Sequence, residues 1–391
     1  MVRTGAGSSN LPSAAKAAEA ACHAALAAGG LDRAEAALLF AAGPVTGSSQ
    51  EMMEAAVAAL GTSAVIGASA DGLVVPARPG GADEASGVAV LALSGLQAEP
   101  LLLAGLAGRE RSAGPEILAV LGGSTTDRDL VLVLPDPLAL DAAALVAGLR
   151  DSLGPAVLVG AGATPTRDGP PLAWCGDEVS PAAAAVLVLR AARPPRVRVT
   201  QSCHPASPLQ TVTRAEGHWV LELDGRPALE AYREAALGPL AADLRRAASF
   251  LLVALPRRAD ASLAPGSYLV RHVVGFDGAR EAFALPEPVA KGRRLSFVLR
   301  DAGAARQDLA ALLEGVSPPQ PAAAIYLDCC ARGASLFGVA GLEAGYLERA
   351  LPGVPLVGVL GACEIGPIGG VAELLTYTGV LALLDGDAAG E

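Results

Sequence analysis

The sequence has few of the residues on which several classes of protein depend. Only two of its 29 basic residues are lysines, Lys16 and Lys291, and the 40 acidic residues leave a net charge of −11. Such a charge repels a phosphate backbone, so nucleic acid is excluded as a general partner. Aromatic residues make up only 3% of the chain, whereas hydrophobic residues make up 52% and charged residues 18%. A disordered protein needs the reverse balance, so these 391 residues predict a folded protein with room for two domains.

Long apolar runs and cysteines are also scarce. The most hydrophobic stretch, Val88–Leu106, is interrupted by charged, amide and proline residues, so no segment is predicted to span a membrane. Six cysteines are too few for a disulfide framework, and Cys329 and Cys330 are adjacent, which favours reduced thiols in the cytoplasm. No signal peptide is predicted, and residues 1–13 are expected to form a flexible end.

The order of predicted elements indicates the fold class. Short apolar segments alternate with alanine-rich helical stretches, which predicts α/β architecture with mixed sheets and flanking helices. The paired prolines Pro194 and Pro195 interrupt this pattern, and we place a domain boundary there. The expected organisation is an N-terminal extension or helix over residues 1–30, a domain over 31–193 and a related domain over 194–391.

A weak internal repeat runs through the chain. Three segments, residues 37–72, 130–163 and 324–361, each show a strand, a polar loop, a helix and a second strand that ends in glycine and other small residues. Glycines after a buried strand let the backbone approach a ligand or another backbone closely. We therefore expect the three ends to cluster and to line a shared cleft near the domain boundary. Tight turns alone would explain the same glycines.

The common catalytic and cofactor motifs are missing. The sequence has no Gly-x-x-x-x-Gly-Lys-Ser/Thr phosphate loop, no Gly-x-Gly-x-x-Gly and no His-Glu-x-x-His. Its four histidines are dispersed and no two cysteines have Cys-x-x-Cys spacing, so neither a metal site nor a cofactor is predicted. Ser69 lies in a near match to the nucleophile elbow, but the residues after it read as extended rather than helical.

Two segments near the C-terminus carry unusual chemistry. In Asp328–Gly333 a buried strand ends in two thiols, and an arginine follows. A guanidinium stabilises a neighbouring thiolate, so Cys330 is the best candidate for a reactive cysteine, and a buried, inert thiol is the alternative. In Gly358–Gly370 five glycines surround the single charge of Glu364. A lone carboxylate there either faces solvent or pairs with a cation, and Arg332 is the natural suggestion.

Four segments of the second half have long and specific sequence patterns. Two segments of the first half, Val65–Gly72 and Gly160–Ala163, have looser patterns. The specific segments are Val212–Leu229, Cys330–Gly333, Glu364–Pro367 and Thr376–Gly379. In these segments the chain resembles the FIST family, which pairs N-terminal and C-terminal FIST domains in bacterial sensory proteins and in one eukaryotic F-box protein. The resemblance covers about residues 37–384.

This resemblance implies a role in sensing small ligands, with amino acids or similar metabolites as the implied ligands. It favours a sensor over an enzyme. Many members of the family carry kinase, cyclase or chemotaxis output modules, whereas here the two FIST domains use up the chain, so we expect output through a separate protein. Two positions depart from the family pattern, namely Ser202–Ser207 at the entry to the second domain and Cys363 before the glutamate.

The site hypothesis that follows places a small zwitterion in the C-terminal domain. Arg332 would bind its carboxylate in a bidentate pair, and Glu364 would receive its ammonium. Gly333 and Gly361 would supply room and amide donors. The remaining candidate ligand-binding residues are Cys330, Cys203, Arg271 and Tyr377. In the structural alternative, Arg332 and Glu364 form an ion pair that joins two loops.

Two other functions stay open. One is a cysteine-dependent enzyme or redox sensor that uses Cys330, with a base among His204, His218 and His272, although no Cys/His spacing motif supports it. The other is a protein-interaction scaffold, for which an alanine-rich helix such as Asp141–Arg150 would supply a surface. A buried helix face explains the same pattern.

Overall fold

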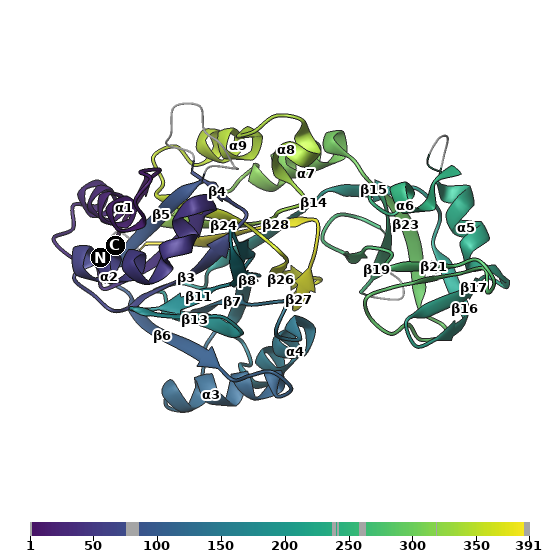
Figure 1. Cartoon of the computed structure of the whole chain (residues 1–391), viewed down its shortest axis with the longest axis horizontal. Coiled ribbons are helices and arrows are strands. Elements are labelled where there is room, and N and C mark those ends of the chain that lie inside the picture. Colours follow the sequence, from purple (N-terminus) through teal and green to yellow (C-terminus); the bar gives the residue numbers. More distant parts are fainter. Residues whose placement is uncertain are drawn as a thin grey trace. The chain divides into compact units, whose positions relative to one another are not determined.

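The computed structural model (Figure 1) describes residues 2–75, 86–236, 240, 242–257, 263–317 and 319–386. The chain divides into two compact units, one drawn from Met1–Val199 and Leu309–Glu391 and the other from Thr200–Asp308. The second unit is therefore inserted into the chain of the first, whereas the sequence suggested consecutive domains. The sequence division at residues 193 and 194 stays a prediction.

Helices occur in both units, and the described residues include none that is long and apolar enough to cross a membrane. The second unit contains α5 (Ala228–Ala235) and α6 (Leu244–Ala247), and α7 (Ala302–Leu313) contains the point at which the chain returns to the first unit. The helices of the first unit are α1 (Ala14–Gly29), η1 (Gly43–Ser48), α2 (Ser49–Leu60), η2 (Glu110–Ser112), α3 (Ala113–Val120), α4 (Ala142–Ser152), α8 (Gly333–Phe337) and α9 (Leu342–Ala350).

The first unit is built from three repeats of strand, helix and parallel strand. The parallel pairs are β2 (Ala36–Ala42) with β3 (Val65–Ala70), β7 (Asp129–Pro135) with β8 (Val157–Ala161), and β24 (Ala323–Cys329) with β25 (Leu356–Gly361). An antiparallel strand flanks the first strand of each pair: β5 (Gly87–Ser94), β13 (Ala183–Arg190) and β28 (Thr378–Leu384). Because parallel strands need a crossover, a helix lies between the members of each pair. The internal repeat predicted from the sequence is confirmed.

The repeats are joined by an exchange of strands. β4 (Gly72–Val74) follows β3 but pairs with β25, β11 (Ala173–Cys175) comes after β8 but pairs with β3, and β26 (Glu364–Ile368) follows β25 but pairs with β8. The exchange closes a cycle of three repeats. Each glycine-rich strand end therefore passes beside a neighbouring repeat, and this positions the candidate site.

The remaining strands of the first unit extend these sheets or form a short hairpin. They are β1 (Arg3–Ser9), β6 (Gln97–Ala104), β9 (Pro165–Thr166), β10 (Gly169–Pro171), β12 (Glu178–Ser180), β14 (Arg196–Gln201) and β27 (Val371–Leu375).

The N-terminal segment is part of the fold. Strand β1 pairs with β5 over its whole length, from Arg3 to Ser9. A Cβ atom at Gly5 would lie 2.1 Å from the carbonyl oxygen of Ala25 in α1, so only glycine allows this contact between strand and helix. The expectation of a flexible end was wrong for these residues, because small residues selected for close packing have the composition of a flexible segment.

Each repeat has its own hydrophobic core between helix and sheet. Met52 and Leu39 belong to the first core, Leu149 to the second and Leu347 to the third. In α4, the helix that the sequence offered as a docking surface, Leu145, Val146 and Leu149 are buried in the second core. The buried-face explanation of its pattern is confirmed.

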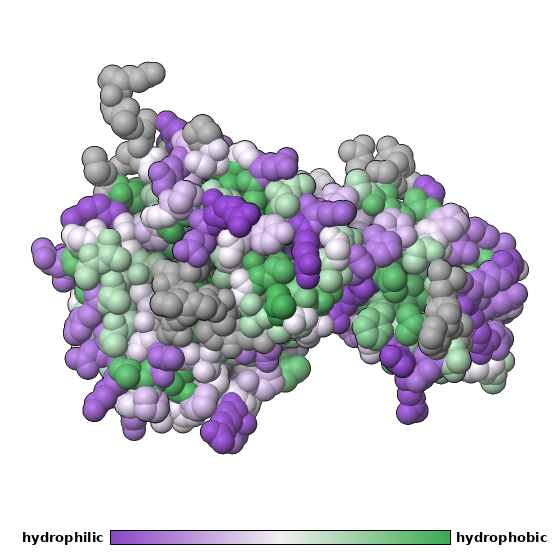
Figure 2. All heavy atoms as spheres, turned by 90° about the horizontal axis from the view of Figure 1, so that it is seen from above, coloured by the Kyte–Doolittle hydropathy of each residue, from purple (hydrophilic) through white to green (hydrophobic). Residues whose placement is uncertain are grey.

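Among the residues that the structure describes, the exposed large hydrophobic side chains are spread along the chain. They are Leu11, Val120, Leu138, Phe250, Val274 and Val339. On the face seen in Figure 2, hydrophobic and hydrophilic residues are interspersed. Single apolar residues on a surface are normal and do not indicate a docking site.

The described residues of the second unit form an antiparallel sheet with two helices. Its strand order is β20-β19-β23-β16-β17-β22-β21, with β15 beside β23 and β18 beside β17. The ring of Tyr232 in α5 lies 5.2 Å from the ring of Phe276 and 5.3 Å from that of Phe297, which fixes the helix on the sheet. The strands are β15 (Cys203–Pro205), β16 (Gln210–Glu216), β17 (Trp219–Leu223), β18 (Arg226–Pro227), β19 (Leu251–Pro256), β20 (Tyr268–Arg271), β21 (Gly275–Asp277), β22 (Ala282–Ala284) and β23 (Arg294–Arg300).

Candidate functional site

The ends of β3, β8 and β25 meet through backbone hydrogen bonds. A Cβ atom at Gly361 would lie 2.9 Å from the Cβ of Ala161. The two backbone segments therefore approach each other more closely at Gly361 than a side chain there would allow. The clustering predicted from the sequence is confirmed, and the cleft that these ends were expected to line stays a prediction. The linking bonds run from the Thr164 amide to the Ser69 carbonyl, from Asp71 to Leu360 and from Ala362 to Gly162, each 2.9 Å long.

The three repeats have the same backbone arrangement, but their side chains differ in charge. From the registers of the parallel pairs, Asp328 in β24 corresponds to Ala41 in β2 and to Leu134 in β7. Glu364 lies opposite Ala161, and the corresponding position in the first repeat is Gly72. The charged side chains at these positions therefore belong to the third repeat, which sets its end of the cluster apart chemically.

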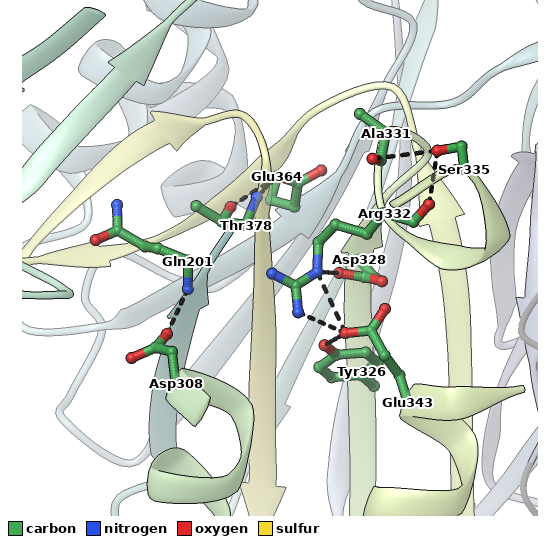
Figure 3. A network of polar contacts seen from close by, with 10 residues as sticks. All are labelled: Gln201, Asp308, Tyr326, Asp328, Ala331, Arg332, Ser335, Glu343, Glu364 and Thr378. Carbon is green, nitrogen blue, oxygen red and sulfur yellow. Dashed lines mark hydrogen bonds and ion pairs between the residues drawn. The ribbon is translucent and has the colours of Figure 1, made fainter. Parts of the chain in front are cut away.

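Arg332 lies directly before α8, fully buried between two carboxylates. Its Nε atom is 2.8 Å from Oδ1 of Asp328, and its Nη2 atom is 2.5 Å from Oε1 of Glu343 (Figure 3). The hydroxyl of Tyr326 donates to the same Glu343 oxygen at 2.7 Å. The ring of Phe337 lies 5.8 Å from the guanidinium carbon. Arg332, Asp328 and Glu343 are all 0% exposed, so this is a buried cluster of charged groups.

The protonation of the cluster follows from burial and from its one cation. Burial and the neighbouring Glu343 carboxylate raise the pKa of Asp328 well above its usual range, against the attraction of Arg332. Burial also acts to raise the pKa of Glu343, but Arg332 and the hydrogen bonds from Asp328 and Tyr326 lower it overall. Burial therefore favours the protonated form of Asp328, whereas Arg332 favours the ionised form of Glu343. This balance avoids an uncompensated buried charge.

Glu364 belongs to a separate polar contact at the start of β26. The side chain is fully buried, and its Oε2 atom accepts hydrogen bonds from Oγ1 of Thr378 at 2.7 Å and from the Thr378 amide at 3.3 Å (Figure 3). Its Oε1 atom is buried without a hydrogen-bond partner among the described residues. Burial and the nearby Cys329 raise the pKa of Glu364 well above its usual range, against the bonds from Thr378. Burial thus favours the protonated form of Glu364.

The two adjacent cysteines have different environments. Cys329 ends β24 and is buried, whereas Cys330 is exposed. The amide of Cys330 donates to the carbonyl of Gly361 at 2.8 Å. A hydrogen bond with the Cys329 thiol lowers the pKa of Cys330, against burial and the negative charges of nearby carboxylates. From the sequence we expected Arg332 to stabilise the thiolate of Cys330. The group that lowers the pKa of Cys330 is instead the thiol of Cys329. The reactivity of Cys330 stays a prediction.

The other candidate residues lie in both units. Gly333 begins α8 with a φ of 56°, and Tyr377, between β27 and β28, has a φ of 60°. In the second unit, Cys203 is buried and its carbonyl accepts a hydrogen bond from the Tyr268 hydroxyl at 2.9 Å. Arg271 is also buried there, with its Nε atom 3.0 Å from Glu287. A ligand-binding role for each of these residues stays a prediction.

The histidines considered as bases for Cys330 lie in the second unit. His204 is on β15, and Nδ1 of His218 is 3.0 Å from the carbonyl oxygen of Leu285. Burial and the charge of Arg271 lower the pKa of His272. Within the part of the chain that the structure describes, no group of three or more histidine, cysteine, aspartate or glutamate side chains is arranged to hold a metal ion.

Sequence reasoning missed the partners of the two central residues, namely Tyr326, Asp328, Glu343 and Thr378. Asp328 gave a usable signal, because it is a charged residue in an otherwise apolar strand and precedes Arg332 by four positions. Glu343 gave none, since an acidic residue in the first turn of a helix is usually a surface residue that favours the helix dipole.

Known proteins resemble this chain over most of its length. Residues 35–226 match the FIST N domain and residues 228–367 match the FIST C domain. An uncharacterized protein of Mycobacterium tuberculosis is 31% identical over 390 residues, which cover 98% of this chain and 99% of that protein. An uncharacterized protein of Mycobacterium bovis is 34% identical over 269 residues, covering 67% of this chain and 69% of the relative.

Among solved structures, a cyanuric acid hydrolase from A. caulinodans aligns with a TM-score of 0.29 and 12% identity, over 48% of this chain and 70% of that one. A likeness at this level supports no functional argument. The domain matches and the full-length relatives do establish the family. The chain belongs to the FIST family and carries both a FIST N domain and a FIST C domain.

Proposed function

We propose that this protein is a small-ligand sensor whose ligand binds at Glu364, where the glycine-rich strand ends of the first unit meet. FIST domains are sensory domains that bind small ligands, and this chain carries both of them. The observation that supports the site most strongly is the buried Oε1 atom of Glu364, which has no hydrogen-bond partner among the described residues. An unsatisfied buried oxygen destabilises a fold, so its presence needs an explanation.

An ammonium group is the ligand chemistry that this oxygen fits best. A buried neutral acid ionises readily when a cation takes the place of its proton, because the ion pair compensates the charge that burial disfavours. Oε2 of Glu364 is already held by Thr378, so Oε1 is the oxygen that can accept from the ligand. A charge-assisted hydrogen bond contributes about 1.5 to 3 kcal/mol, and burial of a small apolar side chain adds to it. Amino acids and other small amines are the proposed ligand class.

Arg332 takes a different role from the one that the sequence suggested. To bind a ligand carboxylate it would have to release Asp328 or Glu343, and a buried carboxylate left without its cation destabilises a protein by about 3 to 5 kcal/mol. We therefore assign Arg332 as a positioning residue, which fixes the loop that joins β24 to α8. The carboxylate of an amino-acid ligand is then left to backbone amides of the glycine-rich ends, the role that the sequence gave to Gly333 and Gly361.

The route to Glu364 is suggested by two neighbouring cysteines. Cys330 is exposed, the adjacent Cys329 is buried, and Cys329 interacts with Glu364. We propose that the ligand enters beside Cys330. A cytoplasmic location and output through a separate protein complete the proposal.

Thermal unfolding of the protein against three sets of compounds tests this function. The sets are amino acids, amines without a carboxylate and carboxylates without an amine. A ligand at 100 times its dissociation constant stabilises the folded state by about 2.7 kcal/mol, enough to raise the unfolding midpoint by several degrees. We expect shifts from compounds that bear an ammonium group, and we expect Glu364→Gln to abolish them. Equal shifts from carboxylates without an amine would contradict the proposed site.

A further inference from the structure

We infer that the repeat containing β7 and β8 carries a binding site for small carboxylates with an apolar chain, at the end of its sheet where Arg190 lies. A cavity of about 410 Å³ opens there, a common size for ligand sites, and its lining combines a guanidinium group with apolar side chains. Glu364 is not part of this lining, so the inference does not depend on the proposed function.

The polar side chains of the cavity come from three neighbouring strand ends. Arg190 of β13 lies directly opposite Gln97 of β6 and, on its other side, opposite Asp129 of β7. Two positions earlier on β13, Val188 lies opposite Glu99. Side chains that are directly opposed, or two positions apart on one strand, point to the same face of a sheet. These side chains therefore share one face.

Helix α3 covers this face and ends beside the cavity. Val188 and Ile117 of α3 belong to the same hydrophobic core. The helix ends at Val120, and both Val120 and Leu121 line the cavity. Val120 is exposed, so a ligand can reach the cavity from solvent. The helix end thus supplies an apolar wall beside the charged strand ends.

The guanidinium of Arg190 has one edge engaged and another edge unused. Its Nε atom is 2.7 Å from Oδ1 of Asp129, and its Nη2 atom is 2.9 Å from Oδ2. Asp129 is fully buried and also accepts a hydrogen bond from the Thr126 amide at 2.6 Å, so the carboxylate that orients Arg190 is itself fixed. Nη1 has no partner among the described residues, and the side chain is exposed. The edge formed by Nη1 and Nη2 can therefore bind a carboxylate in a bidentate pair.

The other lining side chains define the rest of the ligand. Val120, Leu121 and Val188 favour an apolar chain, because its burial removes apolar area from water. Glu99 lies on the same face and repels a second carboxylate on the ligand. Monocarboxylates such as isovalerate should therefore bind better than dicarboxylates such as glutarate.

NMR titration of the full chain with isovalerate, followed at the methyl signals of Leu121 and Val188, tests the inference. We expect saturable shifts with a dissociation constant of about 1 mM, because one charge-assisted pair and a short apolar chain give weak binding. Isovaleramide has nearly the same shape but no charge, so it should bind at least about tenfold more weakly. Equal binding of the two compounds, or shifts that do not saturate at these methyl groups, would overturn the inference.

Val120→Asp, with Val120→Asn as its matched control, tests the place of binding without changing the ion pair. The added carboxylate at this exposed position should weaken isovalerate binding about fivefold relative to asparagine, and equal affinities would contradict the site.

Arg190→Lys separates binding from a merely structural role of the ion pair. Lysine keeps a cation beside Asp129 but lacks the second edge of the guanidinium, so the folded variant should lose most isovalerate binding. Unchanged binding by this variant would overturn the inference. The carboxylates of the thermal-unfolding panel are therefore compared in Arg190→Lys. A shift that is lost there belongs to this cavity, whereas one that persists counts against both this cavity and the ammonium selectivity proposed for Glu364.

Discussion

Glu364 provides a quantitative test of the electrostatics of the site, through the replacement Glu364→Gln. Glutamine has the shape of a protonated glutamate, and its carbonyl oxygen can keep both hydrogen bonds from Thr378. The pKa of Glu364 is raised in the folded protein, chiefly because the side chain is buried. Above the usual pKa of a glutamate, the unfolded chain has lost a proton that the folded chain retains. The wild-type protein therefore loses stability as the pH rises through this window.

The variant lacks this loss, so the difference in free energy of unfolding between Glu364→Gln and wild type should depend on pH. Near pH 4 the two proteins should be about equally stable, because both carry a neutral side chain at this position. Each further pH unit should favour the variant by up to about 1.4 kcal/mol, until the pH reaches the pKa of the folded state. The advantage at pH 7 then reports how far the pKa of Glu364 is raised by folding, at about 1.4 kcal/mol for each unit.

Urea denaturation at pH 4, 5, 6 and 7, followed by circular dichroism, measures this difference. Glu19→Gln, at an exposed position in α1, controls for the loss of one acidic side chain. A difference that stays constant with pH, or a variant that becomes the less stable protein at pH 7, would refute the assignment of Glu364 as a buried neutral acid.

Three further substitutions test the fold around the site. Arg332→Met leaves the carboxyl groups of Asp328 and Glu343 without their cation, so it should destabilise the protein by about 3 to 5 kcal/mol in urea denaturation, whereas a loss below 1 kcal/mol would show that the cluster is not a coupled unit. Gly5→Val places a side chain against the backbone of α1 and should destabilise the protein by about 1 to 3 kcal/mol or more, while an unchanged midpoint would mean that β1 is not part of the core. Leu149→Ala in α4 should destabilise it by about 2 to 5 kcal/mol by opening a cavity, whereas an unchanged stability together with loss of a binding partner would restore the docking role of this helix.

Much of the fold was predictable because it rests on local patterns. The three glycine-rich strand ends are visible in the sequence, since each follows an apolar strand and a helix, and the structure brings them together. The exchange of β4, β11 and β26 between repeats was not predictable. Short strands carry little periodicity, and their partners are set by the packing of whole repeats rather than by local sequence.

The candidate site was predictable in its location but not in its pairing. Arg332 and Glu364 stand out because each is a charge among small and apolar residues. Which carboxylate meets Arg332 depends on α9, which folds back so that Glu343 reaches the end of β24. The spacing of eleven residues between Arg332 and Glu343 fits no local rule, so only the three-dimensional structure shows the pair.

The most direct test of the central claim is calorimetric titration of the strongest ammonium-bearing ligand near pH 6, in two buffers with different enthalpies of ionisation. If the ammonium group replaces the proton of Glu364, close to one proton should be released for each ligand bound, and the apparent dissociation constant should fall by up to tenfold for each unit of rising pH. Glu364→Gln should neither release this proton nor bind with comparable affinity. Binding without proton release, or equal binding by the variant, would contradict the assignment of Glu364 as the ligand-binding residue.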